Sequence, residues 1–304
     1  MKILFVASAN KGAMTPVVVN QAEALISEGV QIDYFSIKGK GIKGYLRNIK
    51  PLRQYLCTHT YDAIHAHYSL SAFVASLAGA KPLIVSLMGS DVKAAGWYKF
   101  IIRLFARLFR WKAIIVKSND MYRDLGIKRA VVIPNGVNMD RFKPMDKTEC
   151  RKRLKWKEER GKKHVLFPAN AARPEKDFAL AEAACALLEN VELHAFENTP
   201  NTETPYWYNA ADAVLMTSKW EGSPNAIKEA MACSRPIVAT NVGDIVERLS
   251  GVEGTFVAQT REPQELSQLL SQAMALSVTK GREQIIADGL DSHDVNKKLI
   301  ELYN

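Results

Sequence analysis

The segment from Ser218 to Ala232 combines a helix start with polar groups that could bind an anion. It reads Ser-Lys-Trp-Glu-Gly-Ser-Pro-Asn-Ala-Ile-Lys-Glu-Ala-Met-Ala and follows an apolar run. Ser223 is a good N-cap and Pro224 suits the first helical position, so a helix is expected over Pro224–Cys233. The backbone N–H groups around Pro224, Asn225 and Ala226 would point outward with the positive end of the helix dipole. Such a site suits a diphosphate.

Two carboxylates and a glycine surround this helix start. Glu229 lies six residues past the expected cap, about 9 Å along the helix at ~1.5 Å per residue. There it could accept hydrogen bonds from both ribose hydroxyls of a nucleotide. Glu221 precedes the cap, beside Gly222, and could bind hydroxyls of a transferred sugar. Carboxylates on both sides of a phosphate site fit a nucleotide-sugar as the ligand better than a bare nucleotide. The alternative is an ordinary helix start with two solvated glutamates.

A loop earlier in the second half carries two cations. Arg173 and Lys176 lie in Ala171-Ala-Arg-Pro-Glu-Lys, directly after an apolar run at 165–168. Cations at the carboxyl end of a strand, facing the helix start, would neutralise a departing diphosphate. The alternative is an exposed basic turn.

Short apolar runs that alternate with helical patterns must position these loops. The pattern predicts strands at Ile3–Ala7, Gln31–Ile37, Ala63–Ala66, Leu83–Leu87, Ala113–Val116, Val131–Ile133, Val165–Pro168, Val191–Phe196, Ala213–Thr217, Ile237–Thr240 and Thr255–Val257. It predicts helices at Pro16–Ser27, Tyr45–Cys57, Ser69–Ala78, Trp97–Phe109, Asn119–Leu125, Asp177–Leu188, Pro224–Cys233, Pro263–Leu276 and Ser292–Leu302.

Strands that are apolar throughout and separated by helices indicate parallel sheets covered on both faces. The expected fold is therefore α/β, with two Rossmann-like, doubly wound domains that face a cleft. We expect these domains at residues 1–145 and 146–290, with the charged stretch 146–163 as a linker or an exposed first helix.

Several strands of the first half precede residues that could line this cleft. Gly12 follows the first strand, where a glycine lets the backbone approach a ligand closely. His67, Asp91 and Asn135 each follow a later strand and are candidate acceptor-binding or cleft residues. A structural role for His67 remains an open alternative.

At these residues the chain resembles the retaining GT-B glycosyltransferases of family 4. Their signature, E-G-x-P…E-A-x-A…P-x-V-A-T…G…E, is matched from Glu221 through Glu229, Pro236 and Gly243 to Glu247. The resemblance implies that Glu229 binds the donor ribose and that the Glu221 loop binds the donor sugar and phosphates.

The resemblance also implies an activity. It implies that the chain is a hexosyltransferase, which moves a sugar from a nucleotide-diphosphate-sugar to a hydroxyl of a glycan or lipid-linked acceptor with retention of configuration. The implied setting is surface polysaccharide or glycoconjugate synthesis. The second domain would bind the donor and the first the acceptor, and a last helix over about 291–304 would pack back on the first domain. A leaving-group phosphate oxygen would take the acceptor's proton.

Two positions depart from the family pattern. Ala171 stands where relatives have the loop arginine, and Met88 stands where many have a histidine that contacts the donor sugar. Methionine donates no polar hydrogen bond, so the backbone does that work, the sugar differs, or the enzyme is impaired. A GT-B epimerase and a non-catalytic member that binds nucleotide or membrane therefore stay as alternatives.

The sequence carries no motif for other cofactors. There is no G-x-G-x-x-G after the first strand, no P-loop and no Asp-x-Asp. We expect no cofactor besides the nucleotide-sugar co-substrate, and a reaction that needs no metal. Four cysteines without C-x-x-C spacing and no signal or membrane-spanning segment predict a cytoplasmic protein.

The charge is distributed unevenly over the chain. Residues 1–145 contain 21 Lys+Arg and 8 Asp+Glu, a net charge of +13, whereas residues 146–304 contain 20 and 24, a net charge of −4. Lys99, Arg103, Arg107 and Arg110 fall on one side of an expected amphipathic helix, with Trp97, Ile101, Leu104, Phe105 and Leu108 on the other. Either the apolar side packs on the sheet, or the helix docks on the anionic inner face of the plasma membrane. A nucleic-acid partner is not expected, because no recognition motif accompanies the charge.

Overall fold

The chain divides into two compact units. The computed structural model describes residues 1–10, 12–92 and 96–304, and its first unit comprises Met1–Gly136 together with Ser292–Asn304. The second unit is Val137–Asp291. The division falls at Gly136, before the expected boundary at residue 145, because the segment after Gly136 packs in the second unit. There Phe142 is buried, and Arg282 donates hydrogen bonds to the carbonyl oxygens of Phe142 (2.7 Å) and Met139 (2.9 Å).

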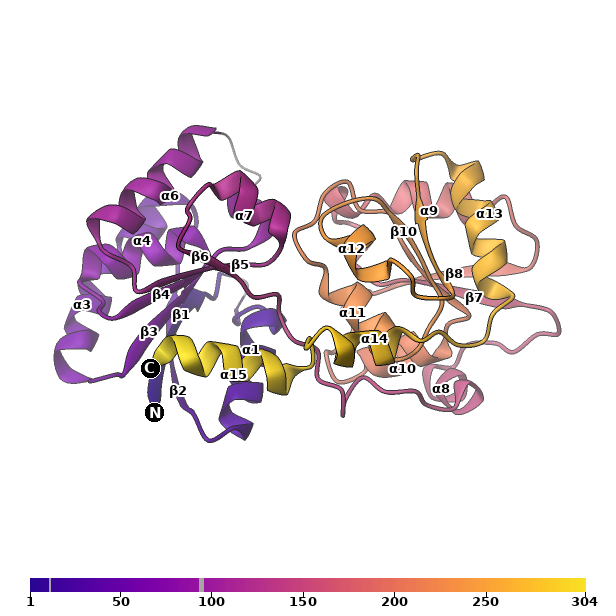
Figure 1. Ribbon diagram of the computed structural model, residues 1–304. Coiled ribbons are helices and arrows are strands. Elements are labelled where there is room, and N and C mark those ends of the chain that lie inside the picture. The colour runs from indigo at the N-terminus through magenta and orange to yellow at the C-terminus, as the bar shows by residue number, and fades with distance from the viewer. Residues whose placement is uncertain (11, 93–95) are drawn as a thin grey trace. The chain divides into compact units, whose positions relative to one another are not determined.

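Six parallel strands form the sheet of the first unit, in the order β2-β1-β3-β4-β5-β6 (Figure 1). They are β1 (Lys2–Ser8), β2 (Gln31–Ile37), β3 (Ala63–His67), β4 (Leu83–Ser86), β5 (Ala113–Val116) and β6 (Ala130–Val132). Successive residues of β1 alternate between two apolar cores, with Leu4 and Val6 in one and Ile3 and Phe5 in the other. A strand buried on both faces must be apolar at every position, which explains the continuous runs.

Helices cover both faces of this sheet. They are α1 (Pro16–Ser27), α2 (Gly41–Leu46), α3 (Ile49–Thr58), α4 (Ser69–Ala78), α5 (Gly89–Val92), α6 (Gly96–Leu108), α7 (Asn119–Leu125) and α15 (Ser292–Tyr303). The C-terminal helix α15 lies beside α1 (Figure 1), and both contribute to the core that contains Phe5. Helices α3, α4, α6 and α7 contribute to the opposite core.

The helix expected over Tyr45–Cys57 is instead two helices, α2 and α3, separated at Asn48. The Asn48 amide donates to the carbonyl oxygens of Gly44 (2.7 Å) and Lys38 (2.9 Å), and it accepts from the N–H of Lys38 (3.2 Å). Asparagine side chains compete with helical hydrogen bonds in this way, so the polypeptide turns here.

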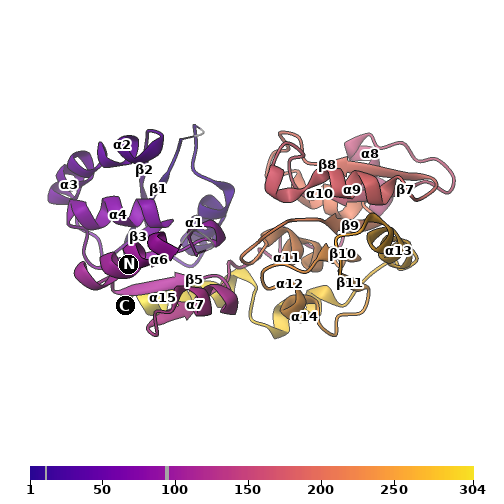
Figure 2. The same ribbon diagram turned by 90° about the horizontal axis from the view of Figure 1, so that it is seen from above.

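Five parallel strands form the sheet of the second unit, in the order β11-β10-β9-β7-β8 (Figure 2). They are β7 (Lys163–Phe167), β8 (Val191–Ala195), β9 (Ala213–Met216), β10 (Ile237–Thr240) and β11 (Thr255–Ala258). Its helices are α8 (Lys147–Leu154), α9 (Phe178–Cys185), α10 (Thr204–Ala210), α11 (Asn225–Ala232), α12 (Ile245–Leu249), α13 (Pro263–Met274) and α14 (Gly281–Ala287), with a 3-10 turn at Pro174–Lys176. Helices α9 and α13 cover one face, and α10, α11, α12 and α14 the other. The prediction of two doubly wound parallel sheets is confirmed.

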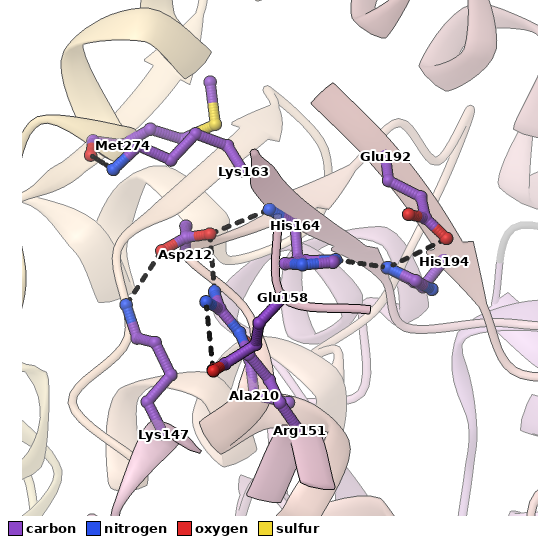
Figure 3. Close-up of polar contacts among 10 residues, drawn as sticks. All are labelled: Lys147, Arg151, Glu158, Lys163, His164, Glu192, His194, Ala210, Asp212 and Met274. Atoms are coloured by element: carbon purple, nitrogen blue, oxygen red, sulfur yellow. Dashed lines mark hydrogen bonds and ion pairs between the residues drawn. The ribbon is translucent and has the colours of Figure 1, made fainter. Parts of the chain in front are cut away.

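The charged stretch after residue 145 contains α8, which is fixed to the sheet by polar contacts. Asp146 caps this helix by accepting from the N–H of Glu149 (2.8 Å). Asp212, before β9, accepts hydrogen bonds from Lys147 (2.9 Å), Arg151 (2.7 Å) and the backbone N–H of His164 (2.7 Å) (Figure 3). No helix in the described ranges is long and apolar enough to cross a membrane.

Candidate functional site

The strand order of the second sheet brings the two predicted loops together. β7 pairs in parallel with β8 on one side and with β9 on the other, so the strands that follow β8 are added on the opposite side of β7. In open parallel sheets, ligand sites lie beyond the carboxyl ends of the strands at such a switch point. The loop after β7 carries Lys176, and the loop after β9 carries Glu221.

Lys176 and Glu221, which are far apart in the sequence, form an ion pair at this point. Their side chains are only 13% and 14% exposed. The same carboxylate oxygen of Glu221 accepts a hydrogen bond from the hydroxyl of Ser218 (2.8 Å). An ammonium and a carboxylate thus stand together in a largely buried position, at the sheet edge where ligands of such folds bind.

Neighbouring segments fix both loops. Thr217 donates its hydroxyl to the carbonyl oxygens of Lys176 (2.9 Å) and Asp177 (2.8 Å). Arg261, after β11, donates to Asp177 (2.6 Å) and to the carbonyl oxygens of Thr217 and Ser218 (both 2.9 Å). Arg261 was not predicted, because no local pattern signals contacts between loops that follow β11, β9 and β7.

Gly243, which belongs to the family signature, supports the Glu221 loop from the other side. It has a φ of +62°, and a Cβ added to it would lie 2.5 Å from the carbonyl oxygen of Gly222. The next residue, Asp244, donates its N–H to that same oxygen (3.2 Å). Only glycine allows the two backbones to approach this closely.

The prediction of Ser223 as the helix cap was wrong. Helix α11 begins at Asn225 with Pro224 in the N-cap position, in an extended conformation, and no side chain caps the helix. Proline can precede a helix without losing a hydrogen bond because it has no N–H. The Ser223 hydroxyl instead accepts a hydrogen bond from Lys228 (3.3 Å). The N–H groups of the first helical turn point away from the helix, as at any helix start.

Glu229 lies on the partly exposed side of α11. Measured from Pro224, it is five residues along the helix, or about 7.5 Å at ~1.5 Å per residue, closer to the helix start than expected. Its carboxylate accepts a hydrogen bond from the hydroxyl of buried Tyr208 (2.8 Å), and burial raises the pKa of the carboxyl. One carboxylate oxygen is therefore used within the protein.

Lys228 was not predicted, although it is the most unusual group near this loop. Its side chain is only 1% exposed, and burial lowers its pKa to about 8. Buried Asp244 partly offsets that effect, and Asp244 is itself fixed by Arg248 (3.0 Å). Within a helical pattern, a lysine normally indicates a solvent-facing position, so no pattern predicts the burial of Lys228.

Arg173 does not join the pair formed by Lys176 and Glu221. It is 55% exposed and forms an ion pair with Glu175 (2.6 Å), two residues further along. Of the two predicted cations, the structure therefore brings only Lys176 to the Glu221 loop.

In the first unit, the predicted residues follow the carboxyl ends of parallel strands and so share one edge of the sheet. Gly12 is exposed with a φ of +93°, and Asn135 is partly exposed after β6. His67, at the end of β3, is buried and stacks on His65 with ring centroids 4.3 Å apart. Burial lowers the pKa of His67 to about 3, so this imidazole is neutral at physiological pH. Met88 is buried after β4.

Asp91 has a complete set of partners within the first unit. Its carboxylate accepts hydrogen bonds from the hydroxyl (2.5 Å) and N–H (3.2 Å) of Ser69 and from the N–H of Met88 (2.7 Å). It therefore joins the starts of α4 and α5, which is a structural role.

Helix α6 differs from the expected two-sided pattern. Its fully buried residues are Ile102 and Ala106, and Phe105 packs partly against Phe73. The predicted apolar side divides, because Trp97, Leu104 and Leu108 are exposed together with Phe100. The predicted membrane-facing cations Arg103, Arg107 and Arg110 are exposed, and Lys99 is partly exposed.

Among the described residues, one group of side chains could hold a metal ion: His164, Glu192 and His194 (Figure 3). His164 and His194 already share a hydrogen bond between Nδ1 and Nε2 (2.8 Å). A cation on Nδ1 of His164 would force a hydrogen onto its other ring nitrogen, which is buried without a partner. The group lies on β7 and on the edge strand β8, and Glu221 follows β9 on the other side of β7.

Two family models match the chain. The model described as Glycosyltransferase Family 4 matches residues 14–141, and the model described as Glycosyl transferases group 1 matches residues 157–275.

Curated relatives come from bacteria. The chain is 25% identical over 238 residues to TuaC of Bacillus subtilis, described as a teichuronic acid biosynthesis glycosyltransferase. It is 28% identical over 200 residues to LpsB of Rhizobium meliloti, described as a lipopolysaccharide core biosynthesis mannosyltransferase. These matches cover 69% and 55% of this chain but 60% and 54% of the relatives, so the chain spans less than two thirds of their length.

Solved structures match over nearly the whole chain. Sucrose-phosphate synthase from Thermosynechococcus elongatus has a TM-score of 0.83 at 16% identity, covering 100% of this chain and 98% of that one. HepE of Anabaena, in complex with UDP-glucose, has a TM-score of 0.75 at 18% identity, covering 99% and 98%. At these identities the likeness establishes the two-domain GT-B fold.

Proposed function

Since this chain belongs to the group 1 glycosyltransferases, a family with the GT-B fold, we propose that it transfers a sugar from a nucleotide-diphosphate-sugar. The acceptor is a hydroxyl of a glycan or of a lipid-linked glycan, and the setting is polysaccharide or glycoconjugate synthesis. The second unit binds the donor and the first unit binds the acceptor.

The observation that carries this proposal is the convergence of four features within the second unit. Lys176 and Glu221 form a largely buried ion pair, α11 starts without a side-chain cap, and Glu229 lies about one and a half turns further along. A cation and a helix start are complementary to a diphosphate. Carboxylates on either side of them are complementary to hydroxyls of a sugar and a ribose.

We propose the following chemistry, in which retention is what the family resemblance implies. The bond between the anomeric carbon and the diphosphate oxygen breaks, and the acceptor oxygen forms a new bond to that carbon with retention of configuration. Lys176 and the first turn of α11 stabilise the negative charge on the departing diphosphate. A phosphate oxygen of the leaving group takes the proton of the acceptor hydroxyl. Fixed groups of the protein thus stabilise the charge of the departing diphosphate without a metal ion.

The relatives support the substrate class. HepE was solved with UDP-glucose, and other structures of it hold UDP or UDP and glucose. TuaC and LpsB are described as enzymes of teichuronic acid and lipopolysaccharide synthesis. For this chain, the sugar and the base are open to experiment.

A second part of the proposal concerns the first unit, which docks on an anionic membrane surface through α6. The exposed apolar residues of α6, with basic residues beside them, support this docking. A membrane-docked enzyme would meet a lipid-linked acceptor at the surface where that acceptor lies.

A thermal-shift screen of nucleoside diphosphates and their sugars tests the donor site. We expect the nucleoside diphosphate of one base to raise the melting temperature of the wild type. The nucleotide-sugar with that base should raise it as well. Glu229→Gln retains an acceptor for the Tyr208 hydroxyl but removes the charge. A charge-assisted hydrogen bond is about twice as strong as a neutral one, so the variant should bind about tenfold more weakly. Glu253→Gln, an exposed glutamate of the same unit, is the control. No shift with any nucleotide would reject the donor site.

A further inference from the structure

An open pocket of about 300 Å³ lies against α6 in the first unit, and arginines dominate its lining. The lining residues are Arg103, Ala106, Arg107, Arg110, Ile127 and Arg129. None of them is acidic. Four positive charges around one pocket attract an anion, so the composition favours an anionic ligand.

Two of these arginines are held in place by backbone carbonyls. Arg129 donates to the carbonyl oxygens of Ala106 (2.6 Å) and Trp111 (2.5 Å), and Arg103 donates through Nε to that of Leu125 (2.7 Å). The Arg103 bond connects α6 to the last residue of its neighbour α7 (Figure 1), and the Arg129 bonds connect the turn before β6 to α6 and to the segment that follows it. They orient the two guanidinium groups but do not neutralise them, because the acceptors are uncharged.

The other two arginines contribute charge at the open side of the pocket. Arg107 and Arg110 are exposed, and neither forms an ion pair with any residue in the described ranges. Arg110 also has a φ of 47°, a left-handed conformation that glycine adopts more easily. A long cationic side chain therefore stands at a position where the backbone favours glycine.

An exposed apolar stripe runs along the same helix. Trp97, Phe100, Leu104 and Leu108 are 67%, 62%, 41% and 65% exposed. Their spacing of three or four residues places them on one face of α6. Large aromatic and aliphatic side chains beside cations are the signature of a helix that lies in a membrane interface, with its apolar face among the acyl chains.

We propose that this arginine pocket binds the phosphate group of an anionic phospholipid while the apolar stripe enters the same leaflet. Guanidinium groups match phosphate oxygens with paired hydrogen bonds, which a diffuse positive surface cannot provide. The stripe selects a lipid over a soluble phosphate, because its burial requires a membrane. This inference rests on the membrane docking proposed above and adds a defined receptor for the headgroup.

The charge-conserving double variant Arg107→Lys/Arg110→Lys separates a pocket from diffuse charge. Co-sedimentation is measured with phosphatidylcholine vesicles, with and without phosphatidylglycerol. Wild type should bind only the anionic vesicles, and the double variant should bind them at least about tenfold more weakly, because lysine cannot form the paired contacts. Arg47→Lys, at an exposed arginine outside the pocket, should bind like wild type. Thermal unfolding verifies that all variants fold.

Three other outcomes would overturn the proposal. If the lysine variant binds like wild type, there is no phosphate pocket, although docking by charge would stand. If Trp97→Ser/Leu108→Ser leaves vesicle binding unchanged and glycerol 3-phosphate stabilises wild type, the ligand is a soluble phosphate. If wild type binds no anionic vesicle, both the pocket and membrane docking fail. The nucleotide screen would still test the donor site independently.

Discussion

Replacing Gly243 by alanine would push directly on the loop that carries Glu221. The added Cβ would lie 2.5 Å from the carbonyl oxygen of Gly222 and 3.0 Å from that of Glu221. Carbon and oxygen atoms approach to about 3.3 Å even in weak C–H···O contacts, so the Gly222 carbonyl must retreat by roughly 0.8 Å. Both obstructing atoms belong to the backbone, so we expect the loop itself to move.

Gly251→Ala is a matched control for this substitution. Gly251 has a φ of +74°, close to the +62° of Gly243, and nothing lies within 4 Å of its added Cβ. Alanine in the left-handed conformation costs about 1 kcal/mol, and overpacking adds ~1–3 kcal/mol. We therefore expect Gly251→Ala to lower the free energy of unfolding by about 1 kcal/mol, and Gly243→Ala to lower it by about 2–4 kcal/mol.

Urea unfolding and calorimetric titration measure the two consequences. The ligand is the nucleoside diphosphate that stabilises the wild type in the thermal-shift screen. A misplacement of about 1 Å can cost ~10²-fold in a positioned site, so the Kd of Gly243→Ala should rise at least about tenfold. The Kd of Gly251→Ala should not change. Equal Kd values in the two variants would refute the inference that Gly243 seats the donor loop, and equal unfolding free energies would refute the clash.

Three further predictions concern stability. Burial lowers the pKa of His194 from 6.5 to about 4. Between these pH values the imidazole binds a proton in the unfolded chain but not in the folded chain. His194 alone should remove up to about 3 kcal/mol of stability as pH drops from 6.5 to 4, and buried His67 adds to this loss. In urea titrations His194→Phe should flatten this slope, and an unchanged slope would exclude His194 as its source. Asp91→Ala should destabilise the protein by about 2–4 kcal/mol, because buried donors lose their acceptor. Its nucleotide Kd should stay unchanged, and a changed Kd would contradict a structural role. Arg282→Met should raise proteolysis near residues 139–142, and an unchanged cleavage pattern would show that Arg282 does not hold this segment.

The sheets and the donor loop were predictable because their signals are local. A strand between two helical layers must be apolar at every position, and the runs around Phe5, Ile64 and Val214 show this directly. Pro224 is likewise a local signal, because its fixed φ and missing N–H suit a helix start whatever surrounds it. The cap at Ser223 was wrong because serine and proline can each begin a helix, and the choice depended on Lys228, which holds the serine hydroxyl.

The supports of the site could not be predicted, because they come from distant segments. Arg261 reaches the carbonyl oxygens of Thr217 and Ser218 from a different loop. Lys228 is buried although its helical position carries no sign of it. Such contacts depend on which loops meet at the sheet edge, and strand order, unlike strand position, is set by the tertiary fold.

Helix α6 shows the same limit at the surface. A periodicity of 3.6 residues identifies apolar positions, but it does not say which of two apolar stripes the sheet covers. The structure buries Ile102 and Ala106 and leaves Trp97 and Leu108 exposed. Neighbouring helices decide this, since Arg103 fixes α6 against the carbonyl end of α7. An apolar stripe reserved for a membrane and one reserved for the core are therefore indistinguishable until the helix is packed.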